Sequence, residues 1–144
     1  MERGTLNLIK GLGGALLREK IVAAASRCLA IIVDGAKLVD RLGAHTPVPV
    51  EVVAFGLEAT QSTLEVLGAT VRLRLGATGE PFVTDSGNRI LDCSFGPIAD
   101  PARLEERIRR VVGVVESGLF IGRANVVFVA ETNGVYRLES PRDG

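Results

Sequence analysis

Residues that can handle an anionic substrate lie close together near the start of this sequence. Lys10 leads into the glycine-rich run Gly11-Leu12-Gly13-Gly14. Glu19 follows in the helix that this run is predicted to open. Glycine lets the backbone approach a ligand closely, and unpaired N–H groups at a helix start attract phosphate or carboxylate. Lys10 adds a full positive charge, and Glu19 can move a proton. The stretch is therefore a candidate anion site with a base beside it.

The same stretch also suits an ordinary glycine turn before a surface helix. It lacks the Lys-Ser/Thr ending of a phosphate-binding P-loop and the strict glycine spacing of a dinucleotide-binding turn. Arg18, Glu19 and Lys20 can form the solvated face of that helix. Spacing alone leaves both interpretations open.

The elements that must position these residues begin with a helix and a strand. The pattern is helical from Gly14 to about Arg27. Its predicted buried stripe, which excludes Arg18, Lys20 and Arg27, comprises Leu17, Ile21, Ala24 and Cys28. The apolar run Cys28–Val33 predicts a strand covered on both faces, as in a parallel sheet. Lys37 would lie at the carboxyl end of that strand, where open α/β sheets hold ligands, and residues 37–42 predict a short helical turn.

A second group of predicted elements follows the proline-containing linker 44–49. The order is strand, helix, strand, strand, helix, strand, which is the ferredoxin-like order. The predicted elements are a strand over 50–55, a helix over 56–67, a strand over 70–75, a strand-like segment 82–84 with a hairpin turn at 85–88, a return strand over 89–93, a helix over 100–111 and a strand over 113–120. The residues expected on the buried stripes of the two helices are Leu57, Thr60, Leu64 and Leu67 in the first and Leu104, Ile108 and Val111 in the second. Asp100 is expected to cap the second helix, with Pro101 at its first position. Two further strands are expected at 124–130 and 135–138, before a polar and frayed tail at 140–144.

The predicted fold class is α/β. Residues 1–47 and 122–144 are expected to form a partial Rossmann-like parallel sheet domain, and residues 48–121 an inserted ferredoxin-like (βαββαβ) α+β lobe.

Composition narrows the classes of function. Seventeen basic and seventeen acidic residues balance, which argues against nucleic-acid and membrane-surface binding, because both need a basic face. No apolar run reaches the length of a membrane span. Cys28 and Cys93 are expected to be reduced core thiols of a cytoplasmic protein. With one histidine and two cysteines, a zinc site is not expected, and His45 is interpreted as a plain loop residue.

Several ordered blocks resemble the A-type ribose-5-phosphate isomerases. Asn7–Lys20 resembles the second block of that family and Asp34-Gly35-Ala36-Lys37 the next one. Further blocks that match in order and spacing are Pro47–Val52, Phe82–Asp92 and Gly113–Phe120. The resemblance covers nearly the whole sequence.

The resemblance implies interconversion of D-ribose 5-phosphate and D-ribulose 5-phosphate in the pentose phosphate pathway, without metal or organic cofactor. It implies that Glu19 is the catalytic base, that Lys10, Gly11, Leu12 and Gly13 bind substrate, and that Lys37 is a second substrate-binding lysine. The chemistry suits these types, since one carboxylate can move a proton between two carbons and Lys10 with the N–H groups of residues 11–14 can stabilise an oxyanion.

Two family blocks, a phosphate loop and an Asp-Gly-Ala-Asp-Glu segment, do not occur in these 144 residues. We therefore expect an N-terminally shortened isomerase chain with an incomplete pocket. The alternatives are a non-catalytic phosphosugar-binding or interaction remnant, and a split enzyme completed by another chain. Because apolar strands that lack sheet neighbours tend to associate, we expect a homo-oligomer, such as a dimer, or aggregation.

Overall fold

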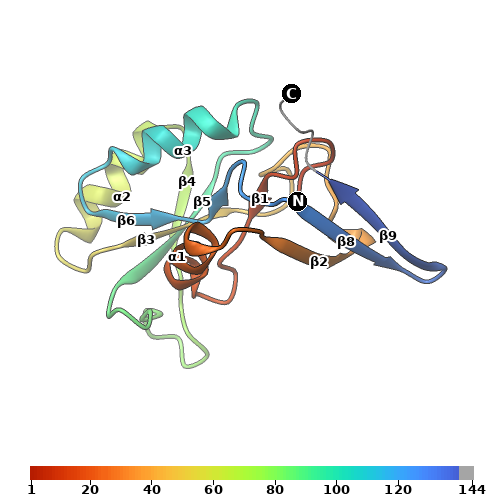
Figure 1. Ribbon diagram of the computed structural model, residues 1–144. Helices are drawn as coiled ribbons and strands as arrows, with labels where there is room; N and C mark the ends of the chain where they lie inside the picture. The colour runs from red at the N-terminus through yellow and green to blue at the C-terminus, as the bar shows by residue number, and fades with distance from the viewer. Residues whose placement is uncertain (140–144) are drawn as a thin grey trace.

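The computed structural model describes residues 1–139, which form three sheets and three α-helices (Figure 1). The elements in chain order are β1 (Leu8–Ile9), α1 (Leu16–Ala25), β2 (Ala30–Asp34), the 3₁₀ helix η1 (Gly35–Lys37), β3 (Val48–Val52), α2 (Leu57–Val66), β4 (Thr70–Leu73), β5 (Arg89–Ser94), α3 (Pro101–Arg109), β6 (Val114–Ser117), β7 (Leu119–Phe120), β8 (Val126–Glu131) and β9 (Gly134–Glu139). The predicted tail 140–144 lies outside the described residues.

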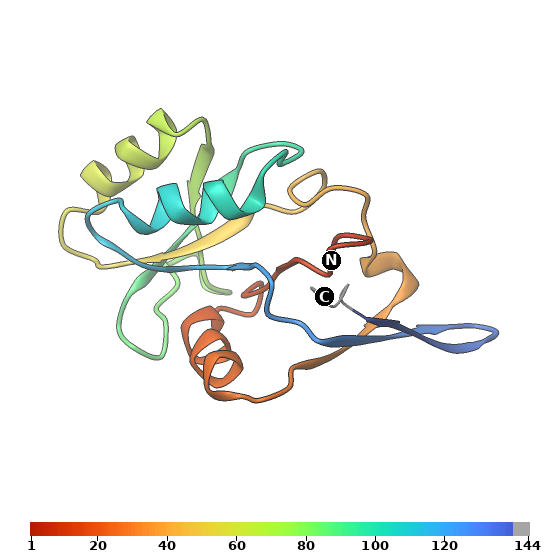
Figure 2. The same cartoon turned by 45° about the horizontal axis from the view of Figure 1, so that its top comes forward.

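The largest sheet has the strand order β4-β5-β3-β6, with every pair antiparallel. Helices α2 and α3 cover one face of this sheet and α1 lies against the other, as Figures 1 and 2 show. The β3-α2-β4-β5-α3-β6 order is the predicted βαββαβ order. The domain boundaries at 47/48 and 121/122 remain a prediction.

The helices of this lobe follow their local sequence. The Asp100 side chain accepts a hydrogen bond from the Arg103 N–H at the start of α3, and Pro101 occupies the first helical position, where its missing N–H costs nothing. Leu104, Ile108 and Val111 are buried, as the periodicity predicted. The predicted stripe of α2 is likewise turned inward, with Thr60 and Leu64 fully covered.

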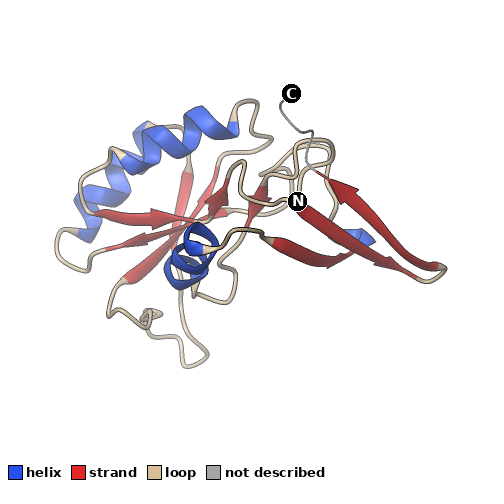
Figure 3. Cartoon of the chain, in the orientation of Figure 1, coloured by secondary structure: helices blue, strands red, loops and turns tan. Residues whose placement is uncertain are grey.

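The second sheet joins β2, β8 and β9, with β2 parallel to β8 and β9 antiparallel to β8. Figure 3 shows it at the opposite end of the molecule from α2 and α3. The parallel pair confirms the α/β class. The prediction that β2 is covered on both faces is wrong, because Ile32 is 79% exposed and every second residue of the strand faces solvent.

Other predictions need correction. The α1 stripe is wrong: Leu16 and Lys20 are buried, whereas Ile21, Ala24 and Cys28 are exposed. Cys28 is therefore no core thiol, although Cys93 is buried. The helical turn expected at 37–42 is absent, and the only helical residues there are those of η1.

Residues 82–84, predicted to be strand-like, form no strand, whereas the turn predicted at 85–88 is present. The buried Glu51 carboxylate accepts hydrogen bonds from the Thr84 hydroxyl and the Asn88 amide, both at 2.9 Å. The Thr84 N–H donates to the Asn88 carbonyl. These contacts close the segment into a loop, and β5 pairs with β4 and β3 instead.

The strand predicted over 113–120 is divided at Gly118 into β6 and β7. The carbonyl of Pro49, near the start of β3, accepts a hydrogen bond from the Gly118 N–H at 2.7 Å. Beyond this point the chain leaves the four-stranded sheet, and β7 pairs with β1.

Candidate active site

Lys10 directly follows β1 of the two-stranded sheet and lies beside the end of the four-stranded sheet. β1 pairs antiparallel with β7, and the Lys10 N–H donates to the Gly118 carbonyl at 2.8 Å. A Cβ atom on residue 118 would lie 2.3 Å from the Lys10 carbonyl oxygen and 2.8 Å from Cδ of Pro49. Only glycine lets these strands approach so closely, so Gly118 fixes the position of the Lys10 backbone.

The glycine run after Lys10 forms a turn that is closed by a hydrogen bond from the Gly14 N–H to the Gly11 carbonyl at 3.0 Å. Gly11 and Gly14 have φ angles of +91° and +89°, a region that favours glycine. The turn precedes α1 rather than forming its first residues, because α1 begins at Leu16. The expectation that the N–H groups of residues 11–14 can all serve an oxyanion is therefore wrong for Gly14, whose N–H already donates to Gly11.

Glu19 lies in the first turn of α1 and reaches back to Lys10. The distance from Lys10 Nζ to Glu19 Oε1 is 3.3 Å, and the two side chains are about one third exposed. The Lys10 ammonium also lies 5.9 Å from the centre of the Phe120 ring. The structure thus places a carboxylate and an ammonium side by side on the protein surface, an arrangement that can serve a proton transfer next to a developing oxyanion.

A cavity of about 720 Å³ opens beside this pair. It is lined by all six residues that the sequence singled out: Lys10, Gly11, Leu12, Gly13, Glu19 and Lys37. Lys37 enters from η1 directly after β2, at the carboxyl end of the strand as predicted.

The cavity also includes residues that sequence reasoning did not assign to a site. Asp34, Arg41 and His45 line it, and they come from the end of β2 and the loop that follows η1. The signal that could have identified them is their position, since Asp34 ends β2 and the other two follow it in the chain. Three cationic side chains line the cavity (Lys10, Lys37 and Arg41) against the two carboxylates of Glu19 and Asp34. This charge balance favours an anionic ligand.

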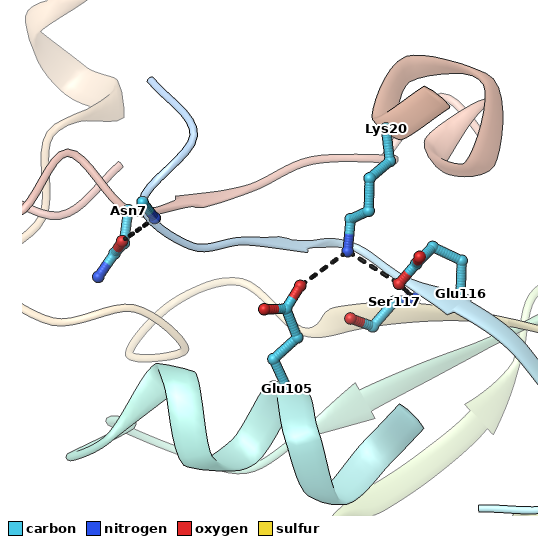
Figure 4. A network of polar contacts seen from close by, with 6 residues as sticks. Asn7, Lys20, Glu105, Glu116 and Ser117 are labelled. Carbon is cyan, nitrogen blue, oxygen red and sulfur yellow. Dashed lines mark hydrogen bonds and ion pairs between the residues drawn. The ribbon is translucent and has the colours of Figure 1, made fainter. Parts of the chain in front are cut away.

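The orientation of α1 depends on Lys20, which the sequence placed outside the buried stripe of the helix. Its side chain is only 5% exposed, and Nζ lies 3.0 Å from Glu105 Oε1 of α3 and 2.9 Å from Glu116 Oε1 of β6. Figure 4 shows the ammonium between these carboxylates. It also lies 5.0 Å from the centre of the Phe120 ring. Because Lys20 is anchored to the four-stranded sheet lobe, the preceding residue on the helix, Glu19, faces the cavity.

Within residues 1–139, no group of three or more histidine, cysteine, aspartate or glutamate side chains is arranged to hold a metal ion. None of the described helices is both long enough and apolar enough to cross a bilayer.

Comparison with known proteins decides the family. The family model for ribose 5-phosphate isomerase A (phosphoriboisomerase A) matches residues 2–134. The chain belongs to the ribose 5-phosphate isomerase A family. A member from Gloeobacter violaceus is 63% identical over 132 residues, which cover 92% of this chain and 57% of the relative. One from Gluconobacter oxydans is 56% identical over 140 residues, or 96% and 61% of the two chains.

Solved structures of the family agree with the fold. The isomerase from Methanocaldococcus jannaschii superimposes with a TM-score of 0.91 at 38% identity, over 96% of this chain and 61% of that one. A D-ribose-5-phosphate isomerase in complex with phospho-erythronic acid gives a TM-score of 0.89 at 39% identity, over 93% and 59%. The chain therefore spans about three fifths of the length of these relatives.

Proposed function

We propose that this chain carries the base and the two lysines of an aldose–ketose isomerase that interconverts D-ribose 5-phosphate and D-ribulose 5-phosphate. The observation that supports this proposal most directly is the 3.3 Å contact between Lys10 and Glu19 at the rim of a cavity that Lys37 also lines. Family membership supports the substrate class, and a phosphorylated ligand is in keeping with the D-ribose-5-phosphate isomerase solved in complex with phospho-erythronic acid.

The chemistry follows from these side chains. The Glu19 carboxylate removes the proton from carbon 2 of the aldose and returns it to carbon 1, so the intermediate is an enediolate. The negative charge that develops on the sugar oxygen is stabilised by the Lys10 ammonium, which already lies beside the base. Lys37 binds the phosphate group and positions the sugar. Carbon 1 is reduced while carbon 2 is oxidised, so the reaction needs no external electron acceptor or organic cofactor.

Replacement of the base tests the assignment. Glu19→Gln keeps the size of the side chain but removes its capacity to accept a proton, and it should lower kcat about 10³-fold with an unchanged melting temperature. Arg18→Gln is the matched control, since Arg18 neighbours Glu19 but pairs with Asp85 on the exposed surface. The comparison is made in whichever form of the enzyme turns over, and turnover by Glu19→Gln at the parental rate would exclude Glu19 as the base.

The extent of chain needed for turnover is tested by complementation. Formation of ribulose 5-phosphate is measured for the 144-residue chain alone and after addition of the part of the Gloeobacter violaceus relative that this chain does not cover. We expect activity only in the mixture, as in a split enzyme. Activity of the chain alone would show that these residues suffice. Binding of ribose 5-phosphate without turnover in either case would favour a non-catalytic phosphosugar-binding module.

We also propose that the protein acts in the cytoplasm, in the non-oxidative pentose phosphate pathway, as a homo-oligomer, most simply a dimer. The support for association is β2, an edge strand whose Ile32 is 79% exposed, because unpaired apolar edges bind other chains. Light scattering coupled to size-exclusion chromatography should give at least twice the monomer mass. A monodisperse monomer would contradict the proposal.

A further inference from the structure

Arg74 directly follows β4 and binds the substrate-binding turn from behind. The alternating pattern of β4 suggests that Arg74 points to solvent, yet its side chain is only 13% exposed. Its Nη1 atom donates to the carbonyl oxygens of Gly11 at 2.9 Å and Leu12 at 3.0 Å. Its Nε donates to Asp92 Oδ2 on the adjacent strand β5 at 2.9 Å, and its Nη2 pairs with Oδ1 of the same carboxylate.

These contacts use the planar, multidentate shape of the guanidinium group. One edge of the group is held by the Asp92 carboxylate, which fixes its plane, and the remaining nitrogen bridges two consecutive carbonyls of the turn. Lysine cannot replace this arrangement, because an ammonium is a point donor without the fork geometry. Since Asp92 neutralises its charge, Arg74 does not offer a free cation to a substrate.

The two carbonyls determine where the neighbouring N–H groups point. In a planar trans peptide the C=O and the N–H lie on opposite sides. The Gly11 carbonyl shares its peptide with the Leu12 N–H, and the Leu12 carbonyl shares its peptide with the Gly13 N–H. Both N–H groups therefore point away from Arg74. Leu12 and Gly13 line the cavity, and among the described residues neither N–H donates to a protein acceptor.

We propose that Arg74, held by Asp92, is a positioning residue that aims the N–H groups of Leu12 and Gly13 into the cavity as a donor pair for a negatively charged oxygen of the substrate. This role rests on the proposed isomerase function. Arg74 itself does not touch the reacting atoms. It sets the direction of two backbone dipoles that would otherwise rotate freely in a glycine-rich turn, so that the donors need no reorganisation when the charge develops.

Kinetics of Arg74→Lys test the proposal, in whichever form of the enzyme turns over. Misplaced donors act mainly on the transition state, so kcat should fall about 10²-fold, while KM changes less than about threefold because Lys37 still holds the phosphate. Asp92→Asn should give a smaller loss of the same kind. Millimolar guanidinium should restore part of the turnover of Arg74→Ala. Arg72→Ala is the matched control, since Arg72 lies on the same strand but is exposed, and it should behave like the parent.

A binding measurement separates this proposal from the proposed function. The amide signals of Leu12 and Gly13 are followed by NMR during titration with phospho-erythronic acid. In the parent chain both amides should shift, and in Arg74→Lys the shifts should be lost, even if the chain has no turnover. If Arg74→Lys does not fold, the same titration is made with Asp92→Asn, in which the shifts of both amides should also be lost. The proposal would be overturned if these variants kept the parental kcat and the parental amide shifts. It would also be overturned if the Leu12 and Gly13 amides of the parent did not respond to the ligand.

Discussion

Replacement of Lys20 by methionine should destabilise the protein far more than loss of an ordinary surface lysine. The Lys20 side chain is 5% exposed, and its partners Glu105 and Glu116 are 16% and 17% exposed. Methionine fills the space of the lysine stem but leaves two carboxylates facing each other without a cation. Removal of one member of a buried ion pair costs about 3–5 kcal/mol, which corresponds to a decrease in melting temperature of roughly 10–15 °C for a chain of this size.

The assay is urea denaturation followed by circular dichroism, with calorimetry for the melting temperature. Arg110→Met is the matched control. Arg110 pairs with Glu106 on the exposed face of α3, and such a pair contributes only about 0.3–0.5 kcal/mol. The triple variant Lys20→Met, Glu105→Gln, Glu116→Gln should recover most of the lost stability, because it leaves no unpaired charge.

Two results would contradict this prediction. If Lys20→Met loses no more free energy of unfolding than Arg110→Met, the charges are solvated and the ion network contributes little. If the triple variant is as unstable as Lys20→Met alone, the loss comes from packing rather than from unpaired carboxylates. Either outcome would also remove the argument that this network fixes the orientation of α1.

Three further predictions concern stability and are checked by urea denaturation or thermal melting. Burial raises the pKa of the Cys93 thiol from 9.0 to about 12; above pH 9 the unfolded chain loses a proton that the folded chain keeps, so the free energy of unfolding should fall by about 1.4 kcal/mol per pH unit up to pH 12. Cys93→Ala should abolish this contribution to the slope and Cys28→Ala should retain it; equal slopes in the two variants would contradict the assignment. Asp100→Ala should cost about 1 kcal/mol through the lost cap of α3, and an unchanged melt would show that the cap contributes nothing. Gly14→Ala should cost about 2 kcal/mol, because the residue has a φ of +89° and a Cβ would lie 2.3 Å from Cζ of Phe82; parental stability would mean that the turn relaxes without strain.

Local sequence was sufficient to predict the elements whose signals lie within a few residues. The cap at Asp100, the proline after it and the apolar spacing of α3 are all read within a dozen positions. The same holds for the surroundings of Lys10, Glu19 and Lys37, since a glycine turn, the start of a helix and the end of an apolar strand are local features. The roles proposed for these three residues come from the family resemblance, because spacing alone did not indicate them.

The failures share a physical cause, which is contact with residues far away in the sequence. The stripe of α1 was predicted one residue out of place because Lys20 becomes a buried residue only when Glu105 and Glu116, 85 and 96 positions away, surround its ammonium. The alternating pattern of β4 suggests a solvent-facing Arg74 side chain, because nothing in that strand indicates that the turn at Gly11 lies over it. The break at Gly118 was missed because it depends on the backbone of Lys10.

The close approach of Gly118 to Lys10 and Pro49 has a consequence for the folding of the protein. Lys10 and Glu19 are near neighbours in sequence, but the contacts that hold their segments in place are remote: 63 positions separate Arg74 from Gly11, and 96 separate Lys20 from Glu116. Closing such long loops is slow and entropically costly until the far partner is already ordered. The four-stranded sheet therefore acts as a template during folding, and the Lys10 turn takes its final form only against a surface assembled from the middle of the chain.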